Sequence, residues 1–402
     1  MSDHDLFPYL YEWASDMDVS LAGNLRRWAE NEVMAKRLEL KEDYEQLLEP
    51  AMRRLFLEIG MQRLFWPEEH GGDGHNTPAA AFTIAAALEQ VARGDVGVAL
   101  MLASLWALQS AVAMEEAVNG EACAALAERV SGSEKPVLVS LILPLFRDEP
   151  QASAKYGKGG WTVDAAATRP LACGGNASLY AVLCDLQGAE EEWGVLLIPG
   201  DAKGIGRGGA MKRTGLAADV NAPVSFSKVK VPEAMCAAKG KEACRAMLSW
   251  LYLGISATTV GALFASYEIL KQWGDSRVIK GRGKIFKENP LTAAVMAEVA
   301  KDTSLARMLT WDLARILSDP AIYGPPGQEG NYVTAAMVVH QVSQAAEGAI
   351  NRAMEMMASA GYAREWNLER YWRDVKTLQL CLGPYELAKM DISRYFYQAS
   401  TL

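Results

Sequence analysis

Few residues in this chain of 402 have the types and spacing of a known reaction centre. His70 and His75 flank a glycine-rich turn and could hold a metal ion together, but a pair of loop histidines is more often solvated. The sequence has no GxSxG elbow and no HExxH pair, the patterns of serine hydrolases and zinc proteases. Hydrolytic chemistry therefore has no support, and we expect no metal site.

Two glycine-rich motifs have the composition of phosphate-binding loops. Gly204–Gly209 imitates a dinucleotide fingerprint, but that motif must be followed by a helix, and here a β-type segment follows. Gly281–Lys284 resembles the end of a P-loop, but the upstream glycine and the Ser or Thr after the lysine are absent. We interpret it as a basic turn between helices that could still meet a phosphate electrostatically.

A third group of charged residues lies near the C-terminus. Arg370, Arg373 and Asp374 fall within six residues of one another and could be functional charges. An ion-pair network that fixes the start of a helix explains them equally well. The sequence leaves both interpretations open.

Composition limits the class of protein. The chain carries 40 Lys and Arg against 49 Asp and Glu, a formal charge of −9, so we expect no nucleic-acid partner. Its six cysteines form no CxxC pair, which favours reduced thiols. The first 18 residues are acidic and lack the pattern of a secretory signal, so we expect a cytoplasmic location.

The elements that must position any site fall into three segments, which predict an α+β fold. Residues 1–130 have helical spacing of apolar residues and form an N-terminal helical domain. Residues 131–240 contain short apolar runs between Gly, Pro, Asn and Asp, and form a middle β domain. Residues 241–402 return to long helices. The runs that predict strands are Val137–Leu143, Leu179–Leu186, Gly194–Ile198 and Val224–Val231, and the predicted C-terminal helices are about 243–275, 290–318, 333–359 and 376–398.

Two uncharged stretches, 96–114 and 246–267, are long enough to cross a membrane. Both contain polar residues, and neither has an aromatic belt or an asymmetric Lys/Arg flank. A helix that is apolar all round is also typical of the centre of a large bundle. We expect buried core helices and no transmembrane segment.

Three separated groups of residues resemble the acyl-CoA dehydrogenase superfamily. Trp66–Gly74 and Leu88–Asp95 resemble its Pro-Glu-Glu-aromatic-Gly-Gly-x-Gly loop and the helix that follows. Lys228–Pro232 is similar to the strand that closes its middle β domain. Gly361–Glu365 and Leu368–Asp374 resemble its C-terminal Glu-Arg-x-x-Arg-Asp signature, the most specific of the three.

The resemblance implies a fold and a chemistry. The implied fold has an N-terminal helical domain, a middle β domain and a C-terminal four-helix bundle. FAD is expected in the cleft between them, with its isoalloxazine against the β domain and its adenosine end reaching a neighbouring subunit. An acyl-CoA thioester lies opposite; a carboxylate removes its α-proton while hydride passes to the flavin. The resemblance further implies electron-transfer flavoprotein as acceptor and a homo- or hetero-oligomer built as a dimer of dimers.

The position of the catalytic base departs from this pattern. The usual base is the Glu of a Tyr-Glu-Gly-Thr turn after the Arg-Asp signature, and Leu382 occupies that position. A subset of the superfamily carries its base on the helix near 248–260, where this chain has Leu251 and Tyr252. Glu386, one helical turn past Leu382, is the nearest carboxylate in sequence and the candidate base.

The expected flavin contacts also differ. Ile142–Arg147 replaces the Thr-Glu-Pro loop, Pro170–Gly175 replaces the Trp-Ile-Thr-Asn-Gly-Gly strand, and Ala358 with Ser359 replaces a Gly-Gly pair. Arg277 is placed like the arginine that meets FAD phosphates across the subunit interface. The candidate cofactor-binding residues are Arg277, Gly281, Gly174, Gly361 and Gly383.

Three functions follow as hypotheses. The first is a flavoenzyme for α,β-dehydrogenation of an acyl-CoA with its base elsewhere. The second is a non-catalytic partner subunit of a hetero-oligomeric acyl-CoA dehydrogenase, which completes the partner's FAD site with Arg277. The third is a superfamily member with other flavin chemistry, such as hydroxylation.

Overall fold

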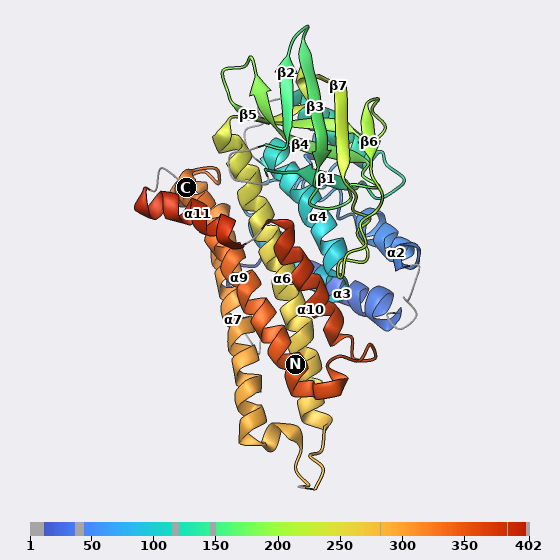
Figure 1. Ribbon diagram of the computed structural model, residues 1–402, viewed down its shortest axis with the longest axis vertical. Helices are drawn as coiled ribbons and strands as arrows, with labels where there is room; N and C mark the ends of the chain where they lie inside the picture. Colours follow the sequence, from blue (N-terminus) through green and yellow to red (C-terminus); the bar gives the residue numbers. More distant parts are fainter. Residues whose placement is uncertain are drawn as a thin grey trace.

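The computed structural model describes residues 12–36, 44–114, 120–144, 150–281, 283–383 and 385–398, and the side chains of 44–47 and 385–388 lie outside this description. The chain forms a helical N-terminal layer, a sheet at one end and a long helical bundle (Figure 1). This is the α+β fold that the sequence predicts. The N-terminal helices are α1 (Asp16–Trp28), α2 (Tyr44–Arg53), α3 (Ala80–Gly94), α4 (Val96–Gln109) and α5 (Gly120–Ser131).

The middle segment folds into an eight-stranded sheet. Seven strands follow the order β6-β7-β3-β2-β4-β5-β8, and β1 pairs in parallel with β4. Residues on one face of β4 and β5 are buried against the helices, which holds the sheet to the bundle. The strands are β1 (Val139–Ile142), β2 (Ala152–Tyr156), β3 (Gly160–Thr168), β4 (Leu179–Gln187), β5 (Trp193–Pro199), β6 (Ile205–Arg207), β7 (Val224–Pro232) and β8 (Cys236–Lys239).

The C-terminal segment is a bundle in which α6, α7, α9 and α10 pack against one another. The helix predicted over 376–398 is wrong: α10 ends at Cys381 and α11 begins at Tyr385. Gly383 takes φ +89°, a left-handed conformation that ends a helix. The helices are α6 (Lys241–Ser276), α7 (Pro290–Ser318), α8 (Pro320–Tyr323), α9 (Glu329–Met357), α10 (Leu368–Cys381) and α11 (Tyr385–Tyr397).

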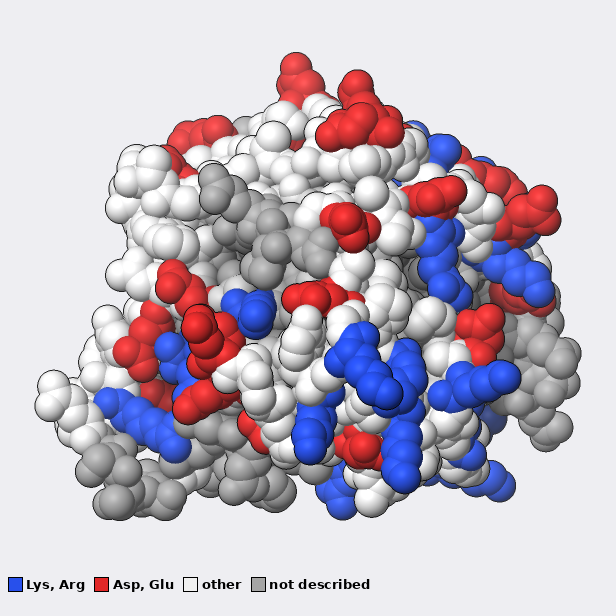
Figure 2. Space-filling view, turned by 90° about the horizontal axis from the view of Figure 1, so that it is seen from above, with Lys and Arg blue, Asp and Glu red and all other residues white. Residues whose placement is uncertain are grey.

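The two long apolar segments are helices inside the protein. Val96–Met114 and Lys241–Ser276 are long and apolar enough to cross a membrane, and 94% of the apolar window of each is buried by the rest of the chain. This burial agrees with the prediction of core helices. Figure 2, which views the sheet end, shows acidic and basic side chains interspersed over that face.

A buried ionic network joins the three segments. Asp95 caps the start of α4 by accepting a hydrogen bond from Val98 N at 2.9 Å. The Arg370 guanidinium pairs with Asp95 and lies 3.4 Å from the Asp374 carboxylate. Asp374 in turn accepts a hydrogen bond of 2.6 Å from the backbone N–H of Leu216 in the β domain. Arg370 and Asp374 are therefore architectural, which decides between the two interpretations of their motif.

A second buried cluster ties α3 to α7. Glu89 is fully buried and accepts hydrogen bonds from Arg307 at 3.0 and 2.8 Å and from the Trp311 indole at 2.7 Å. Arg93 pairs with Glu268 of α6 at 2.6 Å. The charged residues of the 88–95 motif thus bind other helices.

Replacing Arg370 tests the network. Arg370→Met leaves the buried Asp95 and Asp374 carboxylates without their cation, so we expect a loss of about 3–5 kcal/mol in unfolding free energy. Arg352→Met is the matched control, because Arg352 makes an exposed pair with Glu355 at 2.9 Å, worth about 1 kcal/mol or less. Urea unfolding followed by far-UV circular dichroism measures both; equal, small losses would contradict the network's role.

Candidate functional site

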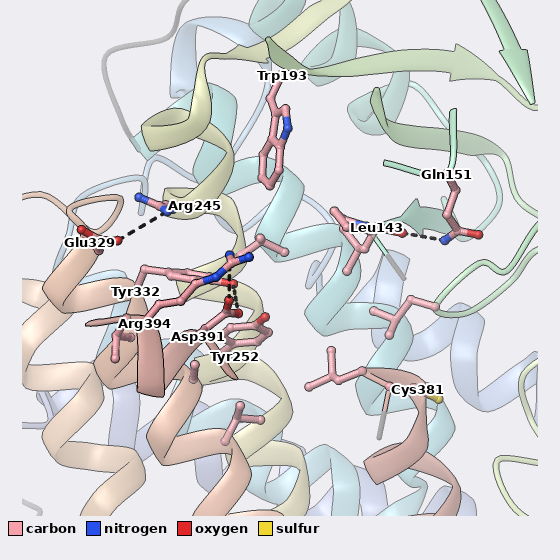
Figure 3. Close-up of a pocket in the computed structure, with 18 of the residues that line it drawn as sticks. Leu143, Gln151, Trp193, Arg245, Tyr252, Glu329, Tyr332, Cys381, Asp391 and Arg394 are labelled. Atoms are coloured by element: carbon pink, nitrogen blue, oxygen red, sulfur yellow. Dashed lines mark hydrogen bonds and ion pairs between the residues drawn. The ribbon is translucent and has the colours of Figure 1, made fainter. Parts of the chain in front are cut away.

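A cavity of about 180 Å³ lies where the sheet meets the N-terminal half of α6. It is lined by the β domain, α6, α9, the end of α10 and α11 (Figure 3). On the side of the β domain, Leu143 and Leu171 contribute hydrocarbon next to Gln151 and Arg169, and Leu382 also lines the cavity. The opposite wall carries charges and phenols from three helices, namely Arg245, Tyr252, Glu329, Tyr332, Asp391 and Arg394.

The structure places the predicted base position in this cavity. Leu382 lines it between Cys381 and Gly383, where the chain leaves α10. A leucine side chain has no lone pair and cannot accept a proton. The candidate base Glu386 lies on α11, but its side chain is outside the described residues.

The described carboxylates that line the cavity are Glu329 and Asp391. Glu329 lies 3.7 Å from the Arg245 guanidinium. Asp391 accepts a hydrogen bond from the Tyr332 hydroxyl at 3.3 Å and lies 4.0 Å from Arg394. Both carboxylates therefore have a positive or hydrogen-bonding partner within the chain.

Tyr252 stands near the second position where a base is found in the superfamily. Burial raises its pKa to about 12, because the charged phenolate loses its hydration. Tyr332 beside it has a pKa raised by burial and by its neighbours Tyr252 and Asp391. Both phenols are neutral at pH 7, so neither replaces the missing carboxylate.

The segment aligned with the flavin-stacking strand is Pro170–Gly175, and its backbone N–H groups form hydrogen bonds within the chain. The backbone N–H of Leu171 donates to Leu141 O at 2.9 Å, and that of Cys173 to the Asp219 carboxylate at 2.6 Å. The N–H of Gly174 donates to the side-chain oxygen of Asn221 at 3.1 Å. These groups bind the 219–221 loop and the sheet and are not presented to a ligand.

The residues around the other expected flavin contact are tied together in the same way. The Gln151 amide donates to the carbonyl oxygens of Leu143 and Arg169 at 2.5 and 3.3 Å, and its oxygen accepts from the Arg169 N–H at 2.6 Å. The side chains of Leu143 and Leu171 line the cavity and offer it only hydrocarbon. Both N–H groups of the Gln151 amide are thus used within the chain, and Arg169 is the residue of this group whose side chain can donate to a ligand.

Two of the four glycines proposed as cofactor contacts serve close packing. A Cβ on Gly174 would lie 2.2 Å from the Ala222 carbonyl oxygen, and one on Gly361 would lie 2.4 Å from the Met354 oxygen. In both cases the chain's own backbone leaves no room for a side chain. Of the candidate residues, Gly383 is the one that lines the cavity.

Arg277 and Gly281 lie far from the cavity. Arg277 follows the last residue of α6 and is exposed, with its guanidinium 5.2 Å from the centre of the Trp273 ring. Arg245 and Arg277 are 32 positions apart along the same helix, which at 1.5 Å per residue is about 48 Å. Figure 1 shows this end of α6 opposite the sheet. The structure therefore does not bring the candidate cofactor residues together.

The resemblance implies FAD, and the described residues of this cleft do not fit it. The backbone N–H groups of Leu171, Cys173 and Gly174 bind the chain itself, and backbone atoms fill the space beside Gly174 and Gly361. We therefore derive no step through a flavin bound in this chain.

The remaining motifs have structural explanations. Gly204–Gly209 contains β6, and Arg207 of that strand donates to the Tyr180 hydroxyl at 2.8 Å, so this segment is not a loop that opens a helix. Gly281 lies in a turn closed by a bridge between Val278 and Ile285. In the part of the chain that the structure describes, no three His, Cys, Asp or Glu side chains gather as a metal site.

Substituting Gly174 tests its packing role. In Gly174→Ala the added Cβ meets backbone, so we expect a loss of about 1–3 kcal/mol in unfolding free energy. Gly348→Ala on α9 is the control, because a Cβ there meets no atom within 4 Å and alanine favours the helix. Thermal unfolding of both variants decides; a Gly174→Ala protein as stable as the parent contradicts the assignment.

Comparison with known proteins gives consistent matches. The family models "Acyl-CoA dehydrogenase, N-terminal domain" and "Acyl-CoA dehydrogenase, C-terminal domain" match residues 15–119 and 238–396. The rat mitochondrial short-chain specific acyl-CoA dehydrogenase is 22% identical over 393 residues, 93% of this chain and 88% of the rat protein. The bovine short/branched chain specific enzyme is 26% identical over 205 residues, which cover 50% of this chain and 45% of that protein.

Solved structures show the same fold. A glutaryl-CoA dehydrogenase from Mycobacterium smegmatis in complex with FADH2 has a TM-score of 0.77 at 15% identity, covering 97% of both chains. A nitroalkane oxidase has a TM-score of 0.81 at 15% identity, covering 96% of this chain and 97% of its own. At this identity the likeness establishes the fold alone.

Proposed function

The chain belongs to the acyl-CoA dehydrogenase family, and on that premise we propose that it is the non-catalytic, acyl-CoA-binding subunit of a hetero-oligomeric acyl-CoA dehydrogenase. The observation that carries the proposal is Leu382, which lines the cavity at the position of the family's usual base. Dehydrogenation of the thioester requires a group that removes its α-proton, and leucine cannot do so. In this proposal a companion chain of the same family supplies the base and the flavin.

The chain's own contribution is binding. The cavity of about 180 Å³ is close to the roughly 150 Å³ cavity known to hold benzene, which limits the acyl group to about six heavy atoms. Arg169, an exposed residue that also lines it, attracts the polyanionic coenzyme A ester. Leu143, Leu171 and Leu382 offer a dry surface for the hydrocarbon.

Arg277 is consistent with an oligomer of family chains. About 48 Å of helix separates Arg277 from the chain's own cavity, so it can act on a cofactor only in a neighbouring subunit. An exposed guanidinium beside Gly281 suits the phosphates of a partner's FAD. We propose a dimer of dimers in the cytoplasm whose companion subunit passes electrons to an electron-transfer flavoprotein.

A second candidate is a catalytic flavoprotein that takes its base from another position. Asp391 and Glu329 favour it, because both carboxylates line the cavity. It requires one FAD per chain and turnover by the chain alone. The third hypothesis, a family member with other flavin chemistry, is supported only by the similarity of the fold to nitroalkane oxidase.

Assembly is the direct test of the proposed function. The full-length chain, tagged and purified from its own cells, should carry a second family chain, and native mass spectrometry should show both in equal numbers. The companion should retain a carboxylate at the position of Leu382. A homotetramer that oxidises acyl-CoA without a second chain would contradict the proposal.

Removing Arg277 tests its role toward the companion's cofactor. In the hetero-oligomer, Arg277→Ala should weaken FAD binding at least tenfold, because a charge-assisted hydrogen bond contributes about 1.5–3 kcal/mol. Lys301→Ala removes the same charge from the exposed face of α7 and should leave flavin content unchanged. The FAD-to-protein ratio after dialysis measures both; unchanged occupancy in the Arg277 variant would remove this residue from the partner's site.

A further inference from the structure

The polar wall of the cavity contains a row of polar side chains. Tyr252 on α6 and Tyr332 on α9 lie side by side, with ring centroids 5.9 Å apart and ring planes at 32°. The Tyr332 hydroxyl donates to the Asp391 carboxylate on α11 at 3.3 Å. Figure 3 shows the three side chains together on one side of the cavity, opposite Leu143.

The direction of this hydrogen bond follows from the donors available. A phenol has one O–H group to donate, and Tyr332 donates it in a hydrogen bond to the Asp391 carboxylate. The Tyr252 hydroxyl beside it has its own proton and lone pairs. The Tyr252 end of the row can therefore accept a hydrogen bond from a ligand or donate one to it.

The charges beside the row select against an anionic ligand group. Arg245 lies over the Tyr332 ring at 5.5 Å and 3.7 Å from Glu329, and Arg394 lies 4.0 Å from Asp391. Each arginine is matched by a carboxylate at this end. A carboxylate on the ligand would face Asp391 and Glu329, whereas a neutral group would meet the phenol without repulsion.

A hydroxyl group has the matching properties, because it is neutral and both donates and accepts. We propose that the acyl group bound in this cavity is short or ring-sized and carries a hydroxyl substituent, which hydrogen-bonds to Tyr252. The inference rests on the proposed function in one respect, since it requires that the cavity take the acyl part of a coenzyme A ester. The leucine side chains then contact the remaining hydrocarbon.

The expected discrimination is large. A site built to hydrogen-bond a hydroxyl disfavours the analogue without it, because the buried polar group is left unpaired. We expect the loss of this hydrogen bond to lower the affinity about tenfold, which corresponds to about 1.4 kcal/mol.

Isothermal titration of the full-length chain with butyryl-CoA and with 3- and 4-hydroxybutyryl-CoA tests the proposal. At least one hydroxy ester should bind tenfold or more tightly than butyryl-CoA. In Tyr252→Phe this ratio should fall below about threefold. Tyr397→Phe, a control on α11 where the side chain is 82% exposed, should keep the parent ratio.

The outcomes separate the two proposals. Equal affinities, or tighter binding of butyryl-CoA or glutaryl-CoA, would overturn the hydroxyl assignment and leave acyl-CoA binding intact. A parent ratio that survives in Tyr252→Phe would also overturn it. Failure of every ester to bind would overturn both. A hydroxyl preference in a chain that proves to be a complete flavoenzyme would support this inference while the partner-subunit function fails.

Discussion

Arg370 lies buried between the carboxylates of Asp95 and Asp374, and the position of the cavity depends on this contact. Asp95 belongs to the start of α4, and Asp374 holds the β-domain backbone at Leu216. A buried ion pair adds little net stability compared with an apolar contact, but removing one member leaves an uncompensated charge. The ion pairs therefore specify how the three segments join. Because Arg370 and Asp374 lie on α10, they also fix the end of this helix, where Leu382 lines the cavity.

The residues that made the resemblance recognisable are mostly architectural. Glu89 holds α7 through Arg307, Arg93 holds α6 through Glu268, and Arg370 joins the segments. None of these contacts involves a cofactor or substrate. A chain can therefore keep the family fold while the positions that do chemistry change, because the two sets of residues are physically separate.

The sequence predicted the order of helical, β and helical segments because apolar periodicity is a local property. The four apolar runs correspond to β1, β4, β5 and β7, whereas β2, β3, β6 and β8 are too polar or too short to stand out. The helix break at Gly383 does have a sequence signal, the Gly383-Pro384 pair, and the single helix predicted over 376–398 ignored it. The row from Tyr252 to Asp391 could not be predicted, since it assembles from three helices far apart in the chain.

The central claim is that this chain retains the family fold without a flavin site of its own. The most direct measurement is the visible absorption spectrum of the full-length chain purified alone, incubated with excess FAD and desalted. The account predicts well under one flavin per chain, because the donors around Leu171 and Gly174 bind the protein itself. One tightly bound FAD per chain would contradict it and would turn attention to Asp391, Glu329 and Glu386 as bases.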